Sequence, residues 1–184
     1  MATPTFIIVV GLSGVGKTAF CNCLSKVSNF HTINSGDAIR NFLATEGIEV
    51  RNRIETGDVF LKNFSEYKLY QIIYDYAISK NANIIDGIRL KSTLNYFLSK
   101  NSKPVIIYIE ASESVRHERF SNRLIQDNSS KEQAEQIISK KNSYFDEVVS
   151  LKKMADYTIN NNVNTDLLEQ AENIWSKVEK YICK

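Results

Sequence analysis

Apolar residues alternate along the chain between short continuous runs and longer stretches with helical spacing. A continuous run such as Phe6–Val10 or Val105–Ile109 is typical of a strand that a parallel sheet buries on both faces. Pro104 stands directly before the second run, at the first position of a strand, where a missing N–H is tolerated. The predicted strands are Phe6–Val10, Phe30–Ile33, Ala82–Asp86, Pro104–Glu110 and Tyr157–Asn160.

Amphipathic stretches fill the intervals between these strands. In the last of them Leu167, Ala171, Ile174 and Val178 recur every three or four residues, which puts them on one face of a helix. The other predicted helices are Lys17–Lys26, a helix that Ser35 caps and that continues to Leu43, Tyr67–Ser79, Lys91–Leu98, Ser112–Ile125 and Lys131–Val149. Strands that alternate with helices predict an α/β fold with a five-stranded, mostly parallel sheet and helices on both faces.

Length and composition favour one globular domain, residues 1–184, because no linker or repeat divides the chain. A net charge of +2 is too small to favour nucleic-acid wrapping or a basic membrane patch. No apolar run approaches the ~20 residues of a membrane span, and the N-terminus lacks a signal-peptide pattern. We therefore expect a cytoplasmic protein without a nucleic-acid or membrane partner.

Directly after the first predicted strand, the chain matches the phosphate-loop pattern G-x-x-x-x-G-K-[ST] at every fixed position, over Gly11–Thr18. Glycines permit backbone conformations in which N–H groups converge on phosphate oxygens, and the following helix adds its positive end. Lys17 can reach the β- and γ-phosphates, and the Thr18 hydroxyl can bind Mg²⁺. The motif predicts a P-loop NTPase, a three-layer αβα sandwich that uses ATP and Mg²⁺. Its predicted nucleotide-binding residues are Gly11, Ser13, Gly14, Val15, Gly16, Lys17 and Thr18.

Among P-loop proteins, the remaining sequence favours a small-molecule kinase. The Asn-Lys-x-Asp guanine reader of GTPases is absent, and a motor, an AAA-type machine or a helicase would need a much longer chain. Three charged segments follow the carboxyl ends of predicted strands, where open α/β sheets bind ligands. They are Asn34–Arg40, Ile84–Arg89 and Val115–Arg123. The first two each pair an acid with an arginine three residues later, which suggests an anionic acceptor.

At these positions the chain resembles the nucleoside monophosphate kinase superfamily. Ser35-Gly36-Asp37 with Arg40 is similar to the acceptor segment of adenylate kinases, and Asp86-Gly87-Ile88-Arg89 to their Asp-Gly-Phe-Pro-Arg segment with one residue fewer. The missing proline argues against a true adenylate kinase. The Asp-Gly-Ile-Arg form, the arginine-rich helix and the ending Ala155–Asn161 resemble dephospho-CoA kinases more closely. The resemblance covers almost the whole chain, although its motifs outside the phosphate loop are short.

The resemblance implies roles for the two acid–arginine pairs. Asp37 would orient or deprotonate the acceptor hydroxyl, and Arg40 and Arg89 would hold an anionic group of the acceptor. Asp86 would face the acceptor site and bind Mg²⁺ through water. Asp37 also suits the first turn of any helix, where Arg40 would simply be solvated. Glu110, which ends the fourth predicted strand, is a rival to Asp86 as the magnesium acid.

The resemblance also implies roles for the arginine-rich helix and the last strand. Arg119 and Arg123 would neutralise the transferring phosphoryl group, whereas Arg116 on the same face is assigned to the surface. The alternative for the whole face is a solvated helix surface. Asn160 would approach the nucleotide base or simply form a strand-end turn. The predicted catalytic residues are Lys17, Asp37, Arg119 and Arg123.

The sequence thus predicts an ATP-dependent phosphotransferase with a nucleotide-like or coenzyme-like acceptor. The acceptor would bind to a helical insertion, about residues 35–80, beside a short lid, about residues 119–135. The alternative is a nucleotide-binding switch or regulatory ATPase, which has no need of an acceptor clamp. The identity of the acceptor, the choice of ATP over GTP and the oligomeric state stay open.

Overall fold

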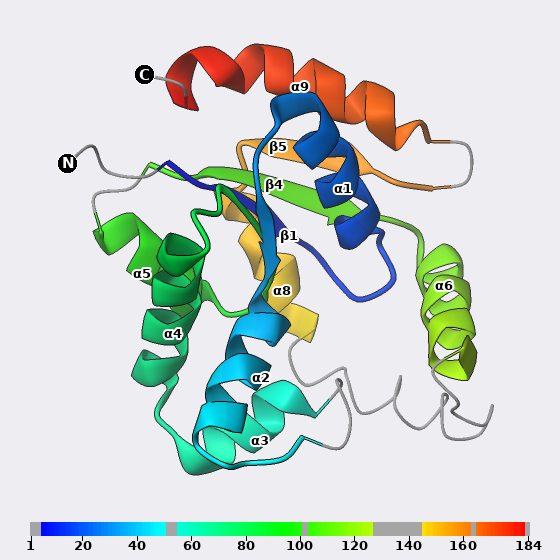
Figure 1. Cartoon of the computed structure of the whole chain (residues 1–184). Coiled ribbons are helices and arrows are strands. Elements are labelled where there is room, and N and C mark those ends of the chain that lie inside the picture. The colour runs from blue at the N-terminus through cyan, green and yellow to red at the C-terminus, as the bar shows by residue number, and fades with distance from the viewer. Residues whose placement is uncertain (1–4, 51–54, 101–102, 127–144, 163–164, 183–184) are drawn as a thin grey trace.

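A parallel sheet of five strands runs through the middle of the protein (Figure 1). The strands lie in the order β2-β3-β1-β4-β5, and each neighbouring pair is parallel. They are β1 (Ile7–Val10), β2 (Thr32–Asn34), β3 (Ile84–Ile88), β4 (Val105–Glu110) and β5 (Tyr157–Asn160). The predicted α/β fold is confirmed, and the sheet is parallel at every described pairing. The computed structural model describes residues 5–50, 55–100, 103–126, 145–162 and 165–182.

Helices cover both faces of this sheet (Figure 1). Helices α1 and α9 pack against each other on one face, whereas α2, α4 and α5 pack on the other. The helices are α1 (Lys17–Ser28), α2 (Ser35–Thr45), α3 (Thr56–Asn63), α4 (Glu66–Ser79), α5 (Lys91–Ser99), α6 (Glu113–Gln126), α8 (Phe145–Ser150), the 3₁₀ helix η2 (Leu151–Met154) and α9 (Leu167–Ile182). In the ranges that the structure describes, none of them has the length and apolar character that a bilayer span requires.

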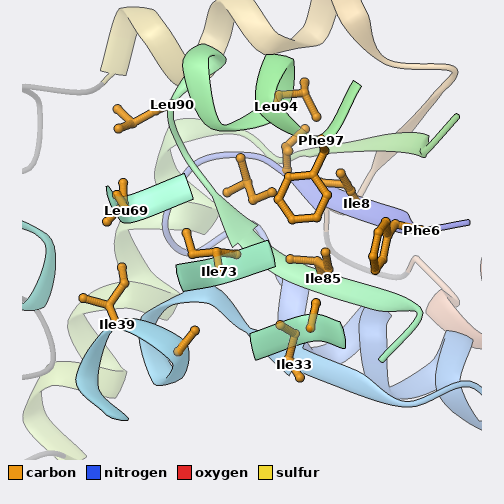
Figure 2. Close-up of a cluster of buried hydrophobic side chains, with 14 of the residues drawn as sticks. Phe6, Ile8, Ile33, Ile39, Leu69, Ile73, Ile85, Leu90, Leu94 and Phe97 are labelled. Atoms are coloured by element: carbon orange, nitrogen blue, oxygen red, sulfur yellow. The ribbon is translucent and has the colours of Figure 1, made fainter. Parts of the chain in front are cut away.

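The residues of β1, together with Phe6 directly before it, supply two separate cores because successive side chains of a strand point to opposite faces. Ile7 and Val9 pack toward α1 and α9, and Phe6, Ile8 and Val10 pack toward α2, α4 and α5. All five are fully buried, which accounts for the continuous apolar run in the sequence. Figure 2 shows the second core, with these labelled side chains: Phe6, Ile8, Ile33, Ile39, Leu69, Ile73, Ile85, Leu90, Leu94 and Phe97.

Strand β3 continues two residues beyond its predicted end at Asp86. Gly87 has a φ of 93°, and the pairing of β3 with β1 shifts register between Val9 and Val10. This bulge lets the strand pass through Asp86 and Gly87 and resume at Ile88. Asp86 therefore lies inside β3 and not at its last position.

Helix α2 is capped by Asn34 and not by Ser35 as predicted. The Asn34 side-chain oxygen accepts a hydrogen bond of 2.9 Å from the backbone N–H of Gly36. Ser35 is the first helical residue, and its hydroxyl donates to the Gly87 carbonyl at 2.9 Å. The second of these bonds joins the start of α2, directly after β2, to the end of β3.

Two further elements differ from the sequence prediction. Helix α3 lies in a stretch for which no separate helix was predicted, although it falls inside the expected helical insertion. Residues 127–144 lie outside the described residues, so most of the predicted lid and of the predicted helix Lys131–Val149 cannot be compared. Helix α8 covers the last part of that predicted helix.

Candidate active site

A cavity of about 600 Å³ opens where the carboxyl ends of β1, β2 and β3 meet. In the strand order, β1 lies between β3 and β4, so the chain first adds strands on one side of β1 and then on the other. Open α/β sheets bind ligands at the carboxyl ends of the strands beside such a switch point. The cavity collects side chains from all three charged segments of the sequence. The predicted site residues that line it are Ser13, Gly14, Gly16, Lys17, Thr18, Asp37, Arg40, Asp86, Arg89, Arg119 and Arg123.

The phosphate loop is held in a backbone shape that requires glycine at two close contacts. Gly14 has a φ of 84°, and a Cβ there would lie 2.3 Å from the carbonyl oxygen of Arg116. Gly16 has a φ of 92° and is the N-cap of α1 without a side-chain cap. The first N–H groups of α1 are thus left for a ligand, as expected of an anion site at a helix N-terminus.

Lys17 folds back over this loop. Its ammonium group donates hydrogen bonds to the carbonyl oxygens of Gly11 at 2.9 Å and Leu12 at 2.8 Å. The pKa of Lys17 is lowered to about 8, chiefly by burial and in part by the nearby charges of Arg89 and Arg123, whereas Asp86 acts in the opposite direction. A desolvated ammonium group among other cations is well placed to attract an anion.

The titration of Lys17 predicts how ATP binding depends on pH. Below about pH 8 the free protein keeps the ammonium charged, and above it the proton is lost. Because the triphosphate binds the charged form, ATP affinity should be constant up to about pH 7.5 and then fall by up to about tenfold per pH unit. The unfolded chain keeps this proton until about pH 10.5, so the contribution of Lys17 to folding stability rises with pH over the same window.

Calorimetric titration of ATP between about pH 7 and about pH 9.5 tests this dependence. The matched control is Lys17→Arg, whose guanidinium stays protonated throughout and should remove the pH dependence. A wild-type affinity that is flat over this range would contradict the proximity of Lys17 to the phosphates.

Asp86 is buried and is oriented by two donors. Its Oδ2 accepts hydrogen bonds from the Thr18 hydroxyl at 2.6 Å and from the Asn34 side-chain amide at 3.1 Å. Its Oδ1 has no hydrogen-bond partner among the described residues. A buried carboxylate oxygen without a donor is costly, and this one lies in the lining of the cavity beside Thr18. The arrangement fits the metal ligand set that the sequence predicts.

Glu110, the rival acid, is directed elsewhere. Its carboxylate pairs with the ammonium of Lys152 at 2.6 Å, and it is not among the residues that line the cavity. Strand β4 therefore ends in a surface ion pair, and Asp86 is the better candidate for the magnesium acid.

Asp37 and Arg40 form an ion pair in the first turns of α2. The Arg40 guanidinium also lies 3.5 Å from the Thr56 hydroxyl of α3. Arg40 is thus held between two helices, and the alternative in which it is simply solvated is wrong. The pairing also means that an acceptor must either displace one partner or bind beside the pair.

Arg116 is not the surface residue that the sequence analysis assigned. Its guanidinium lies 3.4 Å from the carbonyl oxygen of Ser13 and 5.9 Å from the ring centre of Phe145. The close approach of α6 to the phosphate loop explains the difference, because the backbone of Arg116 packs directly against Gly14 and the residue is half-buried.

The other two arginines of α6 line the cavity. Arg119 donates a hydrogen bond of 2.9 Å to the backbone carbonyl of Asn161. Arg123 is more exposed, and its guanidinium stacks over the ring of Phe120 at 4.9 Å. The face shared by these residues is directed toward the phosphate loop, so the solvated-surface alternative does not describe Arg119.

Sequence reasoning missed two asparagines next to the site. Asn34 holds Asp86, and Asn161 donates to the carbonyl of Val15 within the phosphate loop. Asn160, the residue that was predicted, is exposed at the end of β5, and its contact with the nucleotide base stays a prediction. The sequence holds one signal for Asn34: an asparagine directly before a helix that starts with Ser-Gly-Asp is typical of an N-cap.

Away from the phosphate loop, the cavity is lined mainly by aliphatic side chains of the second core. They come from α2, α3 and α4 and from the end of β3, and comprise Ile39, Leu61, Leu69, Ile73, Ile88 and Leu90. The cavity therefore has a charged half at the loop and an apolar half between the helices.

The sequence of this region belongs to a known family. Residues 7–138, which contain the phosphate loop and both acid–arginine pairs, match the family described as AAA domain. The chain is a member of the AAA domain family. Membership shows a P-loop nucleotide-binding domain. The exclusion of an AAA-type machine, which rests on the length of the chain, stays a prediction.

Comparison of this AAA domain with individual proteins supports a kinase-like fold. A UPF0200 protein of Thermoplasma volcanium is 29% identical over 126 residues, which cover 64% of this chain and 66% of that protein, slightly less than two thirds of its length. The crystal structure of shikimate kinase from Aquifex aeolicus superposes with a TM-score of 0.59 at 21% identity, over 95% of this chain and 96% of that chain. A gluconokinase from Sinorhizobium meliloti gives 0.59 at 15% identity, over 100% and 98%. At these identities the likeness to solved structures shows the fold alone.

Proposed function

We propose that the protein is an ATP-dependent kinase that transfers the γ-phosphoryl group to a nucleotide-like or coenzyme-like small molecule. One observation carries this proposal: a single cavity holds Lys17 of the phosphate loop together with two acid–arginine pairs from neighbouring strand ends. Phosphoryl transfer depends on positioning two substrates and neutralising charge, and a second set of anion-binding groups serves that need. A switch or simple ATPase does not require it.

On the donor side, the phosphate loop and Lys17 would hold the ATP phosphates. Thr18 and Asp86 would hold Mg²⁺, since the free Oδ1 of Asp86 and the adjacent hydroxyl are oxygen donors of the kind that Mg²⁺ prefers. When bound, Mg²⁺ would neutralise charge on the phosphate oxygens. Arg119 and Arg123 would add positive charge from the other side of the cavity.

On the acceptor side, the hydroxyl oxygen of the acceptor would form a bond to the γ-phosphorus while the bond between the γ-phosphorus and the ADP oxygen breaks. Asp37 would accept the proton that this hydroxyl group loses. Before that step the carboxylate is paired with Arg40. An anionic group of the acceptor would compete for Arg40 and so release Asp37 for the hydroxyl. Arg89, directly after β3, would hold the same anionic group.

The apolar half of the cavity supports an acceptor with a ring or chain that packs against aliphatic side chains. The names of the fold neighbours indicate shikimate and gluconate as their acceptors, which carry several hydroxyl groups. A buried hydroxyl without a partner costs about 1–3 kcal/mol. Together with the resemblance to nucleoside monophosphate kinases and dephospho-CoA kinases, this favours a nucleotide or coenzyme fragment over a polyol.

A coupled ADP-release assay tests the proposal. The acceptor panel comprises nucleoside monophosphates and dephospho-CoA, with shikimate and gluconate as polyol comparisons. We expect at least one nucleotide or coenzyme acceptor to stimulate ADP release strongly. Slow turnover that is indifferent to every acceptor, from a folded protein that binds ATP, would instead support the regulatory ATPase.

Substitution of Arg89 should act on the acceptor more than on ATP. Arg89→Ala removes a charge-assisted contact worth about 1.5–3 kcal/mol, so the KM of the acceptor should rise about ten- to hundredfold while the KM of ATP changes much less. Steady-state kinetics with each substrate varied in turn measures this. The matched control is Lys91→Ala, because Lys91 is an exposed basic residue two positions further on. An unchanged acceptor titration would remove Arg89 from the acceptor site.

A further inference from the structure

Asn161, directly after β5, is a buried polar residue without a role in the proposed chemistry. Only 4% of its surface is exposed, although asparagine is usually found at the surface. A buried amide is stable only when its polar atoms are bonded, so its partners indicate why it is there.

Those partners belong to three separate segments: the phosphate loop, the end of β4 and helix α6. The side-chain amide of Asn161 donates to the carbonyl oxygen of Val15 at 2.8 Å, inside the phosphate loop. Its backbone N–H donates to the carbonyl of Glu110 at 2.7 Å, which fixes the residue to the end of β4. Its backbone carbonyl accepts from the guanidinium of Arg119 at 2.9 Å.

The contact with the phosphate loop is close as well as specific. A Cβ at Gly16 would lie 2.3 Å from the Nδ2 atom of Asn161, so the loop backbone passes directly over the amide. Val15 itself is only 1% exposed, and its carbonyl is bonded within the interior. Loss of the amide would leave that carbonyl buried without this donor, and the loop would have to change shape to recover one.

We propose that Asn161 is the positioning residue of the donor site: its side chain fixes the curvature of the phosphate loop, and its backbone fixes the direction of Arg119. This inference rests on the proposed ATP site and not on the identity of the acceptor. Asn161 does not line the cavity, so it acts through the loop N–H groups and through Arg119.

Titration calorimetry of Mg²⁺-ATP binding separates this role from simple space filling. Asn161→Ala should weaken ATP binding about tenfold, the equivalent of one lost hydrogen bond to a buried group. Asn161→Asp keeps the size of the side chain but presents a carboxylate oxygen to the Val15 carbonyl, and should weaken binding about a hundredfold. Asn173→Ala and Asn173→Asp, at an exposed asparagine of α9, control for the loss of an amide and for the added charge and should stay within about twofold.

The relative ATP affinities of the two Asn161 variants decide the outcome. A space-filling role would leave Asn161→Asp close to wild type and weaken only Asn161→Ala, and that result would overturn the proposal. Near-wild-type binding by both folded variants would overturn it too. If the alanine variant does not fold, comparison of the aspartate variant with Asn173→Asp gives the answer alone. Absence of ATP binding by the wild type would overturn the donor site itself, a failure distinct from that of Asn161.

Discussion

Lys17→Ala is expected to reduce phosphoryl transfer about a thousandfold or more and to leave the protein folded. The ammonium lies over the carbonyls of Gly11 and Leu12, at the loop that would hold the β- and γ-phosphates. Charge that develops on the transferred group would lose its nearest cation. Because the folded protein keeps this ammonium desolvated and beside Arg89 and Arg123, its removal should leave the unfolding temperature unchanged or raise it.

Lys26→Ala is the matched control for this prediction. Lys26 is exposed in the last turn of the same helix, so its substitution should leave both activity and stability close to wild type. Turnover and thermal unfolding are measured on the same preparations. Activity that survives Lys17→Ala would mean that Lys17 does not hold the phosphates. A large fall in the unfolding temperature of the Lys17 variant would mean that its loss of activity results from unfolding of the protein.

Asp86→Asn is expected to reduce turnover about a hundred- to thousandfold and to raise the Mg²⁺ concentration needed for half-maximal activity. The substitution keeps the size of the side chain but removes the charge and the free carboxylate oxygen. The carbonyl oxygen of the new amide can still accept from the Asn34 amide and the Thr18 hydroxyl, so its NH2 group takes the position of the free carboxylate oxygen. Activity titrated against Mg²⁺ separates weakened metal binding from a general loss.

Glu110→Gln is the matched control, since Glu110 is the acidic residue at the end of β4 in the same sheet and pairs with Lys152. Breaking that partly exposed ion pair should change stability and turnover little. The assignment of the magnesium acid to Asp86 would be wrong if the Glu110 variant lost activity and the Asp86 variant kept it.

Periodicity in the sequence was sufficient for the sheet and for most helices. The run Phe6–Val10 could only be a strand buried on both faces, and Leu167–Ile182 has an apolar stripe that fits one side of a helix. The phosphate loop fixed which end of the sheet holds the site. All of this information is local, within one element or one motif.

Contacts between distant segments could not be predicted in the same way. The roles of Asn34 and Asn161 depend on partners 52 and 146 residues away, and the contact of Arg116 with the Ser13 carbonyl depends on the packing of α6 against the loop. The extension of β3 follows from a bulge that only pairing with β1 defines. By contrast, the Asp37–Arg40 pair is a local feature, because residues three apart on a helix are neighbours.

The central claim is that the γ-phosphoryl group of ATP is transferred to a small molecule, and label transfer tests it most directly. ATP labelled in the γ-phosphate is mixed with the protein, Mg²⁺ and each acceptor of the panel, and the products are separated and counted. We predict that with at least one nucleotide or coenzyme acceptor most of the label appears in the acceptor. Label found only in inorganic phosphate, at the same rate with and without every acceptor, would contradict the kinase and identify an ATPase.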